Sequence, residues 1–183
     1  KVGNLPLTSI NPHFWRSVTG SVMQESFIFS DTFAHNIALD SDSLDETRLY
    51  QAAKMANVDG FIRTLPLGYH TKIGMEGNGV SQGQRQRLLI ARAIYKNPEY
   101  IFFDEATNAL DTTNESEIMH HLYEFYHGRT VVVAAHRLST VKNADQIVVI
   151  DQGKVVEVGN HESLTAKRGA YYNLVKNQLE LGN

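Results

Sequence analysis

The 183-residue sequence contains no cysteine, which excludes a disulfide framework and a thiolate metal site. It has no apolar run that approaches the ~18 residues expected of a membrane span, and residues 1–4 do not resemble a signal-peptide core. The formal net charge of -3 includes no strong excess of one sign, so a nucleic-acid partner held by bulk electrostatics is not expected. What remains is a chain of ordinary apolar content, 42%, whose length suits one compact domain.

Three short apolar runs in the second half of the chain predict strands at 100–103, 130–135 and 146–150. A helical pattern over 115–126 separates the first two. Continuous apolar strands that alternate with helices are typical of parallel strands buried on both faces, so we expect an α/β fold. After the third run, Gln152-Gly153 predicts a two-residue hairpin turn.

The first half of the chain predicts a more helical part. Residues 1–35 mix β-prone stretches with turn residues, whereas 36–98 have a mainly helical pattern with breaks. Helical periodicity is clearest over 44–56 and 84–96, and it returns in residues 164–183 at the end of the chain.

Polar residues follow two of the predicted strands, at the edge where open α/β sheets bind ligands. Asp104 and Glu105 come directly after the first apolar run, and His136 after the second. Asp104 can hold the Mg²⁺ of a nucleotide through water, because that ion takes only one or two protein carboxylates. Glu105 can polarise a water that attacks the γ-phosphate. Acidic residues also end many strands without any function, and a lone histidine is usually structural, so each residue has a second interpretation.

Ser81 and Gln84 fit a capping box that opens the helix over 84–96. This pair can be a cap and nothing more. The free N–H groups and dipole of a helix N-terminus also bind anions, and Gly83 lets the backbone approach a phosphate closely. Arg85, Arg87 and Arg92 follow on the same helix, and a solvated face or salt bridges to neighbouring helices explain them better than a nucleic-acid patch.

Taken in order, these segments resemble the motifs of the nucleotide-binding (ATPase) domain of ABC transporters. The matching segments are Val22–Glu25 for the glutamine loop, Val80–Arg87 for the signature, Tyr100–Glu105 for the Walker B motif, Asn108–Asp111 for the D-loop and Ala135–Arg137 for the switch histidine. Five motifs in the family's order leave little room for coincidence, and the resemblance covers essentially the whole chain. It implies an ABC-type P-loop NTPase fold, with a mainly parallel buried sheet and a helical subdomain.

The resemblance also implies a role for each matching residue. Glu105 would be the general base, and His136 would contact the γ-phosphate. Gln24 and Asp104 would serve Mg²⁺, with Gln24 also coupling the site to a transmembrane domain. The remaining residues would act across a head-to-tail homodimer that closes around two ATP molecules: they are Ser81, Gly83, Gln84 and Asp111.

Several segments resemble exporters. Phe27–Thr32 with Asn36-Ile37, and Leu65–Tyr69 with Thr71–Gly74, match stretches that exporters place after the glutamine loop and before the signature. Residues 81–84 and 172–179 are most similar to bacterial peptidase-containing peptide and bacteriocin exporters. This implies a transmembrane domain in the same chain or complex, and a location at the cytoplasmic face of the bacterial inner membrane.

The sequence departs from the family pattern at three positions. The signature has Val80 where leucine is usual, and Gln82 where the first glycine is usual. Before the signature, Met75 separates Gly74 from Glu76, although exporters usually place the glutamate directly after that glycine.

A phosphate-binding loop of the form Gly, four residues, Gly-Lys-Ser/Thr does not occur in the sequence. Its one Gly-Lys pair, Gly153-Lys154, precedes Val155 in the predicted hairpin. We therefore expect residues 1–183 to be a single, N-terminally truncated ABC ATPase domain, with a helical subdomain at 36–98 and the C-terminal part of the RecA-like core at 99–183. Alone, this piece should hydrolyse ATP hardly at all, and its sheet should expose an edge that favours dimerisation or swapping.

Two other functions remain open. One is an ABC-type ATPase of DNA repair or chromosome maintenance, but residues 1–80 lack the heptads of the long coiled coil that such proteins carry. The other is a degenerate domain that binds nucleotide without turnover. Glu105 and His136 speak against it, and Gln82 leaves it open.

Overall fold

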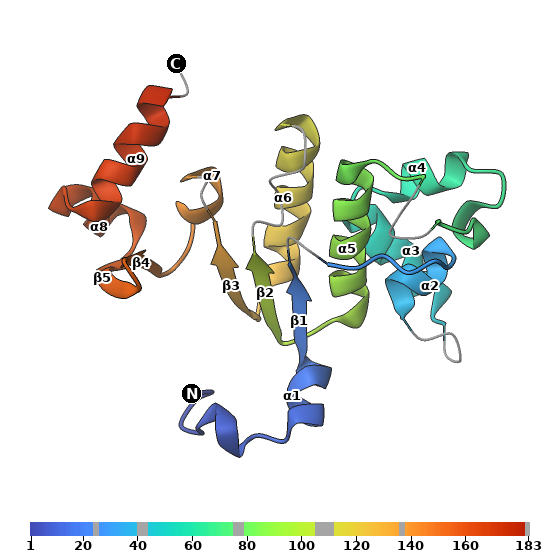
Figure 1. Ribbon diagram of the computed structural model, residues 1–183, viewed down its shortest axis with the longest axis horizontal. Helices are drawn as coiled ribbons and strands as arrows, with labels where there is room; N and C mark the ends of the chain where they lie inside the picture. The colour runs from blue at the N-terminus through green and yellow to red at the C-terminus, as the bar shows by residue number, and fades with distance from the viewer. Residues whose placement is uncertain (24–25, 40–43, 75–78, 105–111, 136–137, 182–183) are drawn as a thin grey trace. The chain divides into compact units, whose positions relative to one another are not determined.

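The structure, a computed structural model, describes residues 1–23, 26–39, 44–74, 79–104, 112–135 and 138–181 (Figure 1). The chain divides into two compact units, Lys1–Ala134 and Ala135–Asn183. Each unit is described by itself below.

A three-stranded parallel sheet forms the centre of the first unit. It consists of β1 (Thr19–Val22), β2 (Tyr100–Asp104) and β3 (Thr130–Ala134), in that spatial order. The register pairs Val22 with Phe103 and Asp104 with Ala134, so the carboxyl ends of all three strands lie at one edge. This confirms the strands predicted from the first two apolar runs, and their parallel pairing.

Helices account for most of the rest of the first unit. They are α1 (Pro12–Val18), α2 (Phe33–Ala38), α3 (Glu46–Met55), α4 (Asp59–Thr64), α5 (Gln82–Lys96) and α6 (Thr112–Tyr126), with short 3₁₀ turns η1 (Leu7–Ser9) and η2 (Gly68–His70). The helical patterns over 44–56, 84–96 and 115–126 are confirmed by α3, α5 and α6. Helix α1 was not predicted, although Asn11 caps it and Pro12 occupies its first turn, as helix starts favour.

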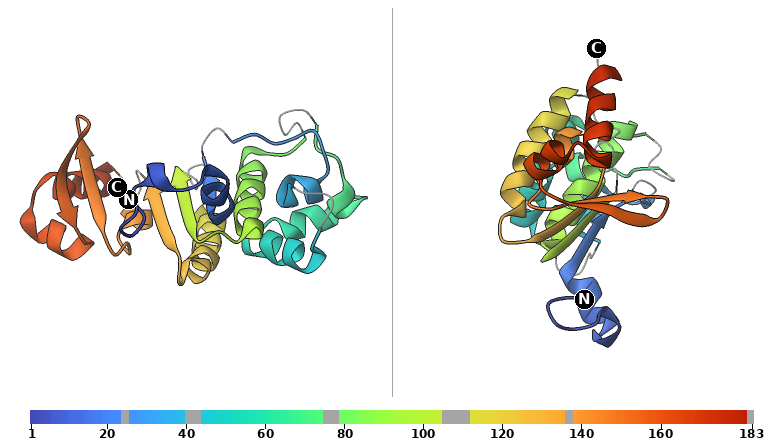
Figure 2. Two further views of the ribbon diagram at one scale, coloured as in Figure 1. Left: turned by 90° about the horizontal axis from the view of Figure 1, so that it is seen from below. Right: turned by 90° about the vertical axis from the view of Figure 1, so that its left-hand side faces the viewer.

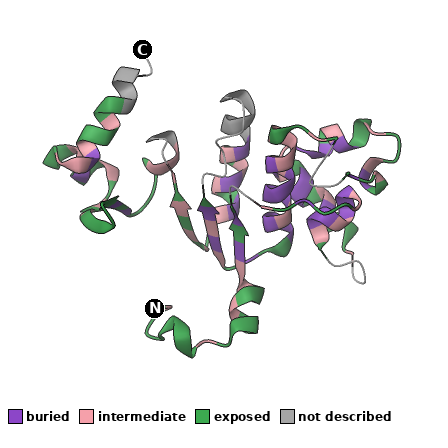
Figure 3. Cartoon of the chain, viewed as in Figure 1, coloured by how far each residue is buried: buried purple, intermediate pink, exposed green. Residues whose placement is uncertain are grey.

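The core of the first unit joins the helices to the sheet. Helix α5 lies beside β1 and packs on its other side against α2 and α3 (Figure 1). Its residues Leu88, Ile90 and Ala91 are fully buried, as are Ile28 and Leu49 (Figure 3). Apolar packing of the adjoining elements therefore holds the buried middle of α5 in place, which supports whatever its N-terminus binds.

Burial of the sheet differs from the expectation of two covered faces. Ile101 and Phe103 of β2 are buried in the core that includes Ile118 and Leu122 of α6. Val132 of β3, whose side chain points to the opposite face, is 50% exposed. The prediction is wrong for β3, because α6 packs on one face only and no described element of this unit covers Val132 on the other.

The second unit contains α7 (Leu138–Val141), the strands β4 (Ile147–Asp151) and β5 (Lys154–Gly159), and the helices α8 (His161–Lys167) and α9 (Ala170–Leu181). Strands β4 and β5 form an antiparallel hairpin (Figure 2). Gln152 and Gly153 both have positive φ, 46° and 74°, which matches the right-handed twist of a two-residue turn. The predicted hairpin is confirmed.

The third apolar run was expected to be another parallel strand. It forms β4, which in the described part of the chain pairs only with the antiparallel β5. The tight Gln152-Gly153 turn explains the antiparallel pairing of β4 with β5, because a two-residue connection can join only antiparallel neighbours. Leu164 of α8 and Tyr171 of α9 pack on Ile147 and Val149 to form a small separate core.

Candidate functional site

The carboxyl edge of the parallel sheet is the first part of the candidate site. Val22, Asp104 and Ala134 end the three strands there. Asp104 is exposed and lies in register beside Ala134. An exposed carboxylate at the carboxyl end of a central parallel strand occupies the edge at which such sheets bind ligands.

Four predicted site residues lie outside the residues that the structure describes: Gln24, Glu105, Asp111 and His136. Their positions in the sequence are informative even so. Gln24 follows the end of β1 by two residues, Glu105 follows β2 directly, and His136 follows β3 by two. Their roles stay predictions.

The second part of the candidate site is the N-terminus of α5. Ser81 is the N-cap: its Oγ accepts a hydrogen bond from the Gln84 backbone N–H at 3.2 Å, and its own N–H donates to Gln84 Oε1 at 2.8 Å. The predicted capping box is thus confirmed. Helix geometry leaves the N–H groups of Gln82 and Gly83 without intrahelical acceptors, which suits the binding of an anion.

The structure therefore brings Ser81, Gly83 and Gln84 into one helical turn, while Asp104 lies on a separate element. Within the described ranges, no hydrogen bond or ion pair connects Asp104 to that turn. Gln84 uses its side-chain oxygen in the cap, so a phosphate would meet its amide nitrogen or the free backbone N–H groups.

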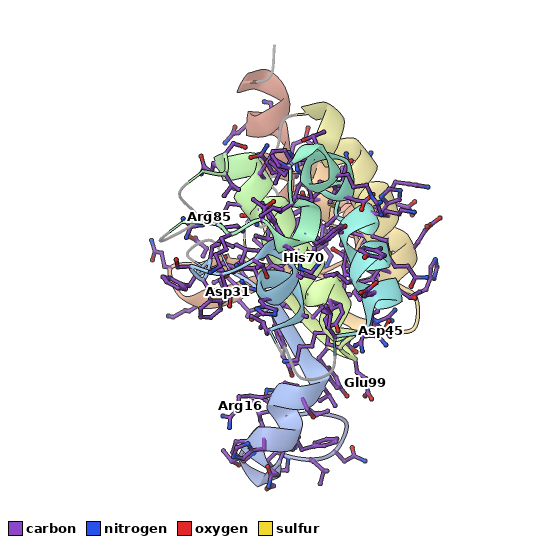
Figure 4. The ribbon with its side chains drawn as sticks, turned by 90° about the vertical axis from the view of Figure 1, so that its right-hand side faces the viewer. Arg16, Asp31, Asp45, His70, Arg85 and Glu99 are labelled. Atoms are coloured by element: carbon purple, nitrogen blue, oxygen red, sulfur yellow. The ribbon has the colours of Figure 1, made fainter. Side chains whose placement is uncertain are left out.

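Two arginines of α5 make contacts that the sequence did not predict, because they bind backbone carbonyl oxygens. Arg85 donates from Nη2 to the carbonyl oxygen of Ser26 at 2.9 Å (Figure 4 labels Arg85). Arg92 donates from Nε to the carbonyl oxygen of Asn36 at 2.7 Å and from Nη1 to that of Phe27 at 2.9 Å. The guanidinium groups bind backbone carbonyls because the segment after β1 runs along the helix, and sequence periodicity gives no signal of such a contact.

Asn36 is the buried partner of this arrangement, and the sequence marked it only as part of an exporter-like segment. It is 0% exposed. Its Nδ2 donates to the carbonyl oxygens of Phe29, Asp31 and Thr32, and its Oδ1 accepts from the Phe29 N–H at 2.8 Å. Arg92 Nη2 also donates to Oδ1 at 3.2 Å, and burial lowers the pKa of Arg92 to about 10.

The described residues fit a Mg²⁺ ion that is held mainly by a nucleotide. Within those ranges no group of three or more His, Cys, Asp or Glu residues forms a metal-binding cluster. Mg²⁺ bound with nucleotide phosphates keeps several waters and needs only one or two carboxylates, and Asp104 offers one at the sheet edge. In the same ranges no helix has the length and apolar character needed to cross a membrane.

Comparison with known proteins agrees with this arrangement. The family model described as ABC transporter matches residues 1–108. The ATP-dependent lipid A-core flippase of Saccharophagus degradans is 47% identical over 177 residues, which are 97% of this chain and 30% of the flippase. The toxin RTX-III translocation ATP-binding protein of Actinobacillus pleuropneumoniae is 45% identical over 175 residues, which are 95% of this chain and 24% of that protein.

A solved structure of a bacterial Atm1-family ABC exporter with ATP bound superposes with a TM-score of 0.89 at 39% identity, over 94% of this chain and 30% of that one. The chain thus has an ABC ATPase fold, which combines a parallel sheet with helices. The chain belongs to the ABC transporter family, and its relatives include exporters. It spans about 30% of the length of the flippase that it matches.

Proposed function

We propose that this chain is the ATP-hydrolysing motor domain of a membrane ABC exporter. The observation that carries the proposal is the pair of sites on one folded unit: the free N–H groups of a capped α5 N-terminus, and the exposed Asp104 at the carboxyl edge of the parallel sheet. A helix N-terminus binds phosphate, and a strand-end carboxylate serves the Mg²⁺ of a nucleotide.

In this proposal each residue keeps the role that its motif implies. Glu105 activates the attacking water, and His136 contacts the γ-phosphate. Gln24 and Asp104 serve Mg²⁺. The residues that complete the site of a second copy are Ser81, Gly83, Gln84 and Asp111. Because the residues of each ATP site come from two different copies, ATP is hydrolysed in a head-to-tail homodimer.

The proposed partners are a transmembrane domain, in the same chain or complex, and a second ATPase domain, at the cytoplasmic face of a bacterial inner membrane. The division into a helical subdomain at 36–98 and a core part at 99–183 belongs to the same proposal. The names of the relatives support export in general, since they mention a lipid A-core flippase and RTX toxin translocation. Export of peptides or bacteriocins is the finer proposal, which rests on the resemblance of residues 81–84 and 172–179.

The experiment is Mg-ATP turnover by the full-length protein that contains this chain, beside the same protein with Glu105→Gln. We expect the unmutated protein to hydrolyse ATP. The variant should bind ATP and reduce kcat at least about 100-fold, the size of effect that removal of a general base produces. A variant with undiminished turnover would show that Glu105 is not the base. An unmutated protein that binds ATP without turnover would favour the non-catalytic function.

A further inference from the structure

Two arginine side chains of α5 hold residues 26–36 against the helix by hydrogen bonds to backbone carbonyl oxygens. Near the start of the helix, Arg85 binds the carbonyl oxygen of Ser26. Further along the same helix, Arg92 binds the carbonyl oxygens of Phe27 and Asn36. We call Arg85, Arg92 and Asn36 the clamp.

Both Arg92 and Asn36 of the clamp make several hydrogen bonds. All three kinds of guanidinium nitrogen of Arg92 donate: Nε to Asn36 O, Nη1 to Phe27 O and Nη2 to Asn36 Oδ1. The buried Asn36 amide in turn bonds the backbone of Phe29 through both its N–H and its carbonyl oxygen. A half-buried guanidinium group with this many partners favours one arrangement, so Arg92 holds the segment and the helix together.

The helix and the segment together join the turn proposed to contact ATP to an exposed pair of aromatic residues. The helix begins at Ser81 and Gly83, the turn proposed to contact ATP. The segment carries Phe27 and Phe29, which are 52% and 47% exposed and pack edge to face at 5.2 Å. Arg92 lies over the Phe29 ring at 5.4 Å, so the same side chain also fixes one of these aromatics.

We propose that Arg92 is a positioning residue for ATP hydrolysis: it makes residues 26–36 move together with the phosphate-contacting turn of α5. The inference rests on the proposed function, because the turn has to contact ATP for its position to matter. Arg92 does not touch nucleotide in this account. It acts by holding residues 26–36, which begin two positions after Gln24 in the chain, at a constant distance from Ser81.

Arg92→Lys is the variant that tests this role. It keeps the positive charge, but an ammonium group is a single point and cannot reach the three acceptors that the planar guanidinium fork spans. Arg48→Lys is the matched control, since Arg48 also packs on α5, 4.9 Å from the ring of Tyr95, and donates no hydrogen bond to residues 26–36, all of which the structure describes. Arg85→Lys is a milder variant that loosens one bond of the clamp and keeps the test available should Arg92→Lys fold poorly.

The first readout is hydrogen–deuterium exchange of the full-length protein. We expect Arg92→Lys to speed exchange in peptides covering 26–36 at least about threefold, with exchange in α3 and α5 unchanged, because the opening is local. A purely structural role would instead speed exchange across the whole first unit. Uniform exchange of that kind, or no change anywhere, overturns the proposal.

The second readout is the kinetics of Mg-ATP turnover. We expect Arg92→Lys to lower kcat by between about twofold and thirtyfold while the KM for ATP stays unchanged, the range that positioning residues produce. Arg85→Lys should lower kcat less, and Arg48→Lys should match the unmutated protein. Equal kcat values for Arg92→Lys and the unmutated protein overturn the positioning role and leave the proposed function intact. An unmutated protein without turnover overturns both.

Discussion

At the scale of single residues, Asp59 shows how the fold holds a buried charge. It is 9% exposed, and both of its carboxylate oxygens accept from Arg63 Nε, at 2.8 and 2.9 Å. Tyr69 donates to Oδ1 at 2.6 Å, and burial together with this carboxylate raises the pKa of Tyr69. A buried carboxylate needs every one of these donors, because desolvation without them is unfavourable. The network thereby fixes η2 to α4.

Tyr69→Phe should therefore destabilise the protein by about 1–3 kcal/mol, since it removes a hydrogen bond to a buried carboxylate, whose Oδ1 then keeps only Arg63 as a donor. Chemical unfolding measures the change. Tyr50→Phe is the control: Tyr50 donates to the exposed Glu46 at 3.3 Å, and its loss should change the free energy of unfolding by less than about 0.5 kcal/mol. Equal effects of the two substitutions would contradict the buried network.

Single residues were also where prediction from the sequence was weakest. Asp104 could be predicted at a strand end, because an apolar run that stops in acids is a local pattern. Arg92 and Asn36 could not, since their bonds span 56 positions along the chain and depend on how segment 26–36 folds back over α5. Contacts of that kind follow from tertiary packing, which periodicity does not contain.

At the scale of elements, α5 was predictable because its start has chemistry of its own. Ser81 and Gln84 satisfy each other's backbone N–H groups, and this needs only a spacing of three residues. The helix ends with Asn97 in the left-handed region at φ 55°, a conformation that asparagine adopts more readily than most residues. Helix α1 has equally local signals in Asn11 and Pro12, but it is short and buries no described residue, so no apolar stripe revealed it.

Ser81→Asp distinguishes the capping role of Ser81 from its proposed contact with phosphate. Aspartate caps a helix as well as serine does, and its charge suits a helix N-terminus, so the free energy of unfolding should stay within about 0.5 kcal/mol of the unmutated value. A carboxylate at this position would repel the γ-phosphate, so ATP turnover should fall at least about tenfold.

The matched control for Ser81→Asp is Asn160→Asp, because Asn160 caps α8 in a capping box of the same form. It should change neither stability nor turnover appreciably. Normal turnover in Ser81→Asp would mean that Ser81 is a cap and nothing more.

Strand β1 contains Gly20, which lies so close to Pro98 that a side chain would not fit, and this contact can be recognised only in the folded structure. A Cβ on Gly20 would lie 2.7 Å from Pro98 Cγ, in the turn between α5 and β2. We expect Gly20→Ala to destabilise the protein by about 1–3 kcal/mol through overpacking. Gly60→Ala in α4, where nothing lies within 4 Å of the added Cβ, should be neutral or stabilising by up to about 1 kcal/mol. Thermal unfolding of both variants would settle the comparison, and a neutral Gly20→Ala would disprove the close contact.

At the scale of the whole molecule, the proposed ATP site combines residues from two copies of the chain. The described residues place Asp104 and the α5 turn on separate elements, and the family resemblance assigns them to the two different ATP sites of a dimer. The order of the motifs allowed the family to be recognised from the sequence, and the match to an exporter structure at a TM-score of 0.89 confirms the fold. The cargo and the membrane partner were predicted from the resemblance to exporters alone, and both stay predictions.

The most direct test is complementation between two inactive copies. Full-length protein with Ser81→Asp and full-length protein with Glu105→Gln would be coexpressed with different tags, purified through both tags and assayed for Mg-ATP turnover. In a head-to-tail dimer one site combines an unmutated Ser81 with an unmutated Glu105, while the other site has both substitutions. We predict turnover clearly above that of either parent homodimer. Mixed dimers no more active than the parents would contradict a site shared between two copies.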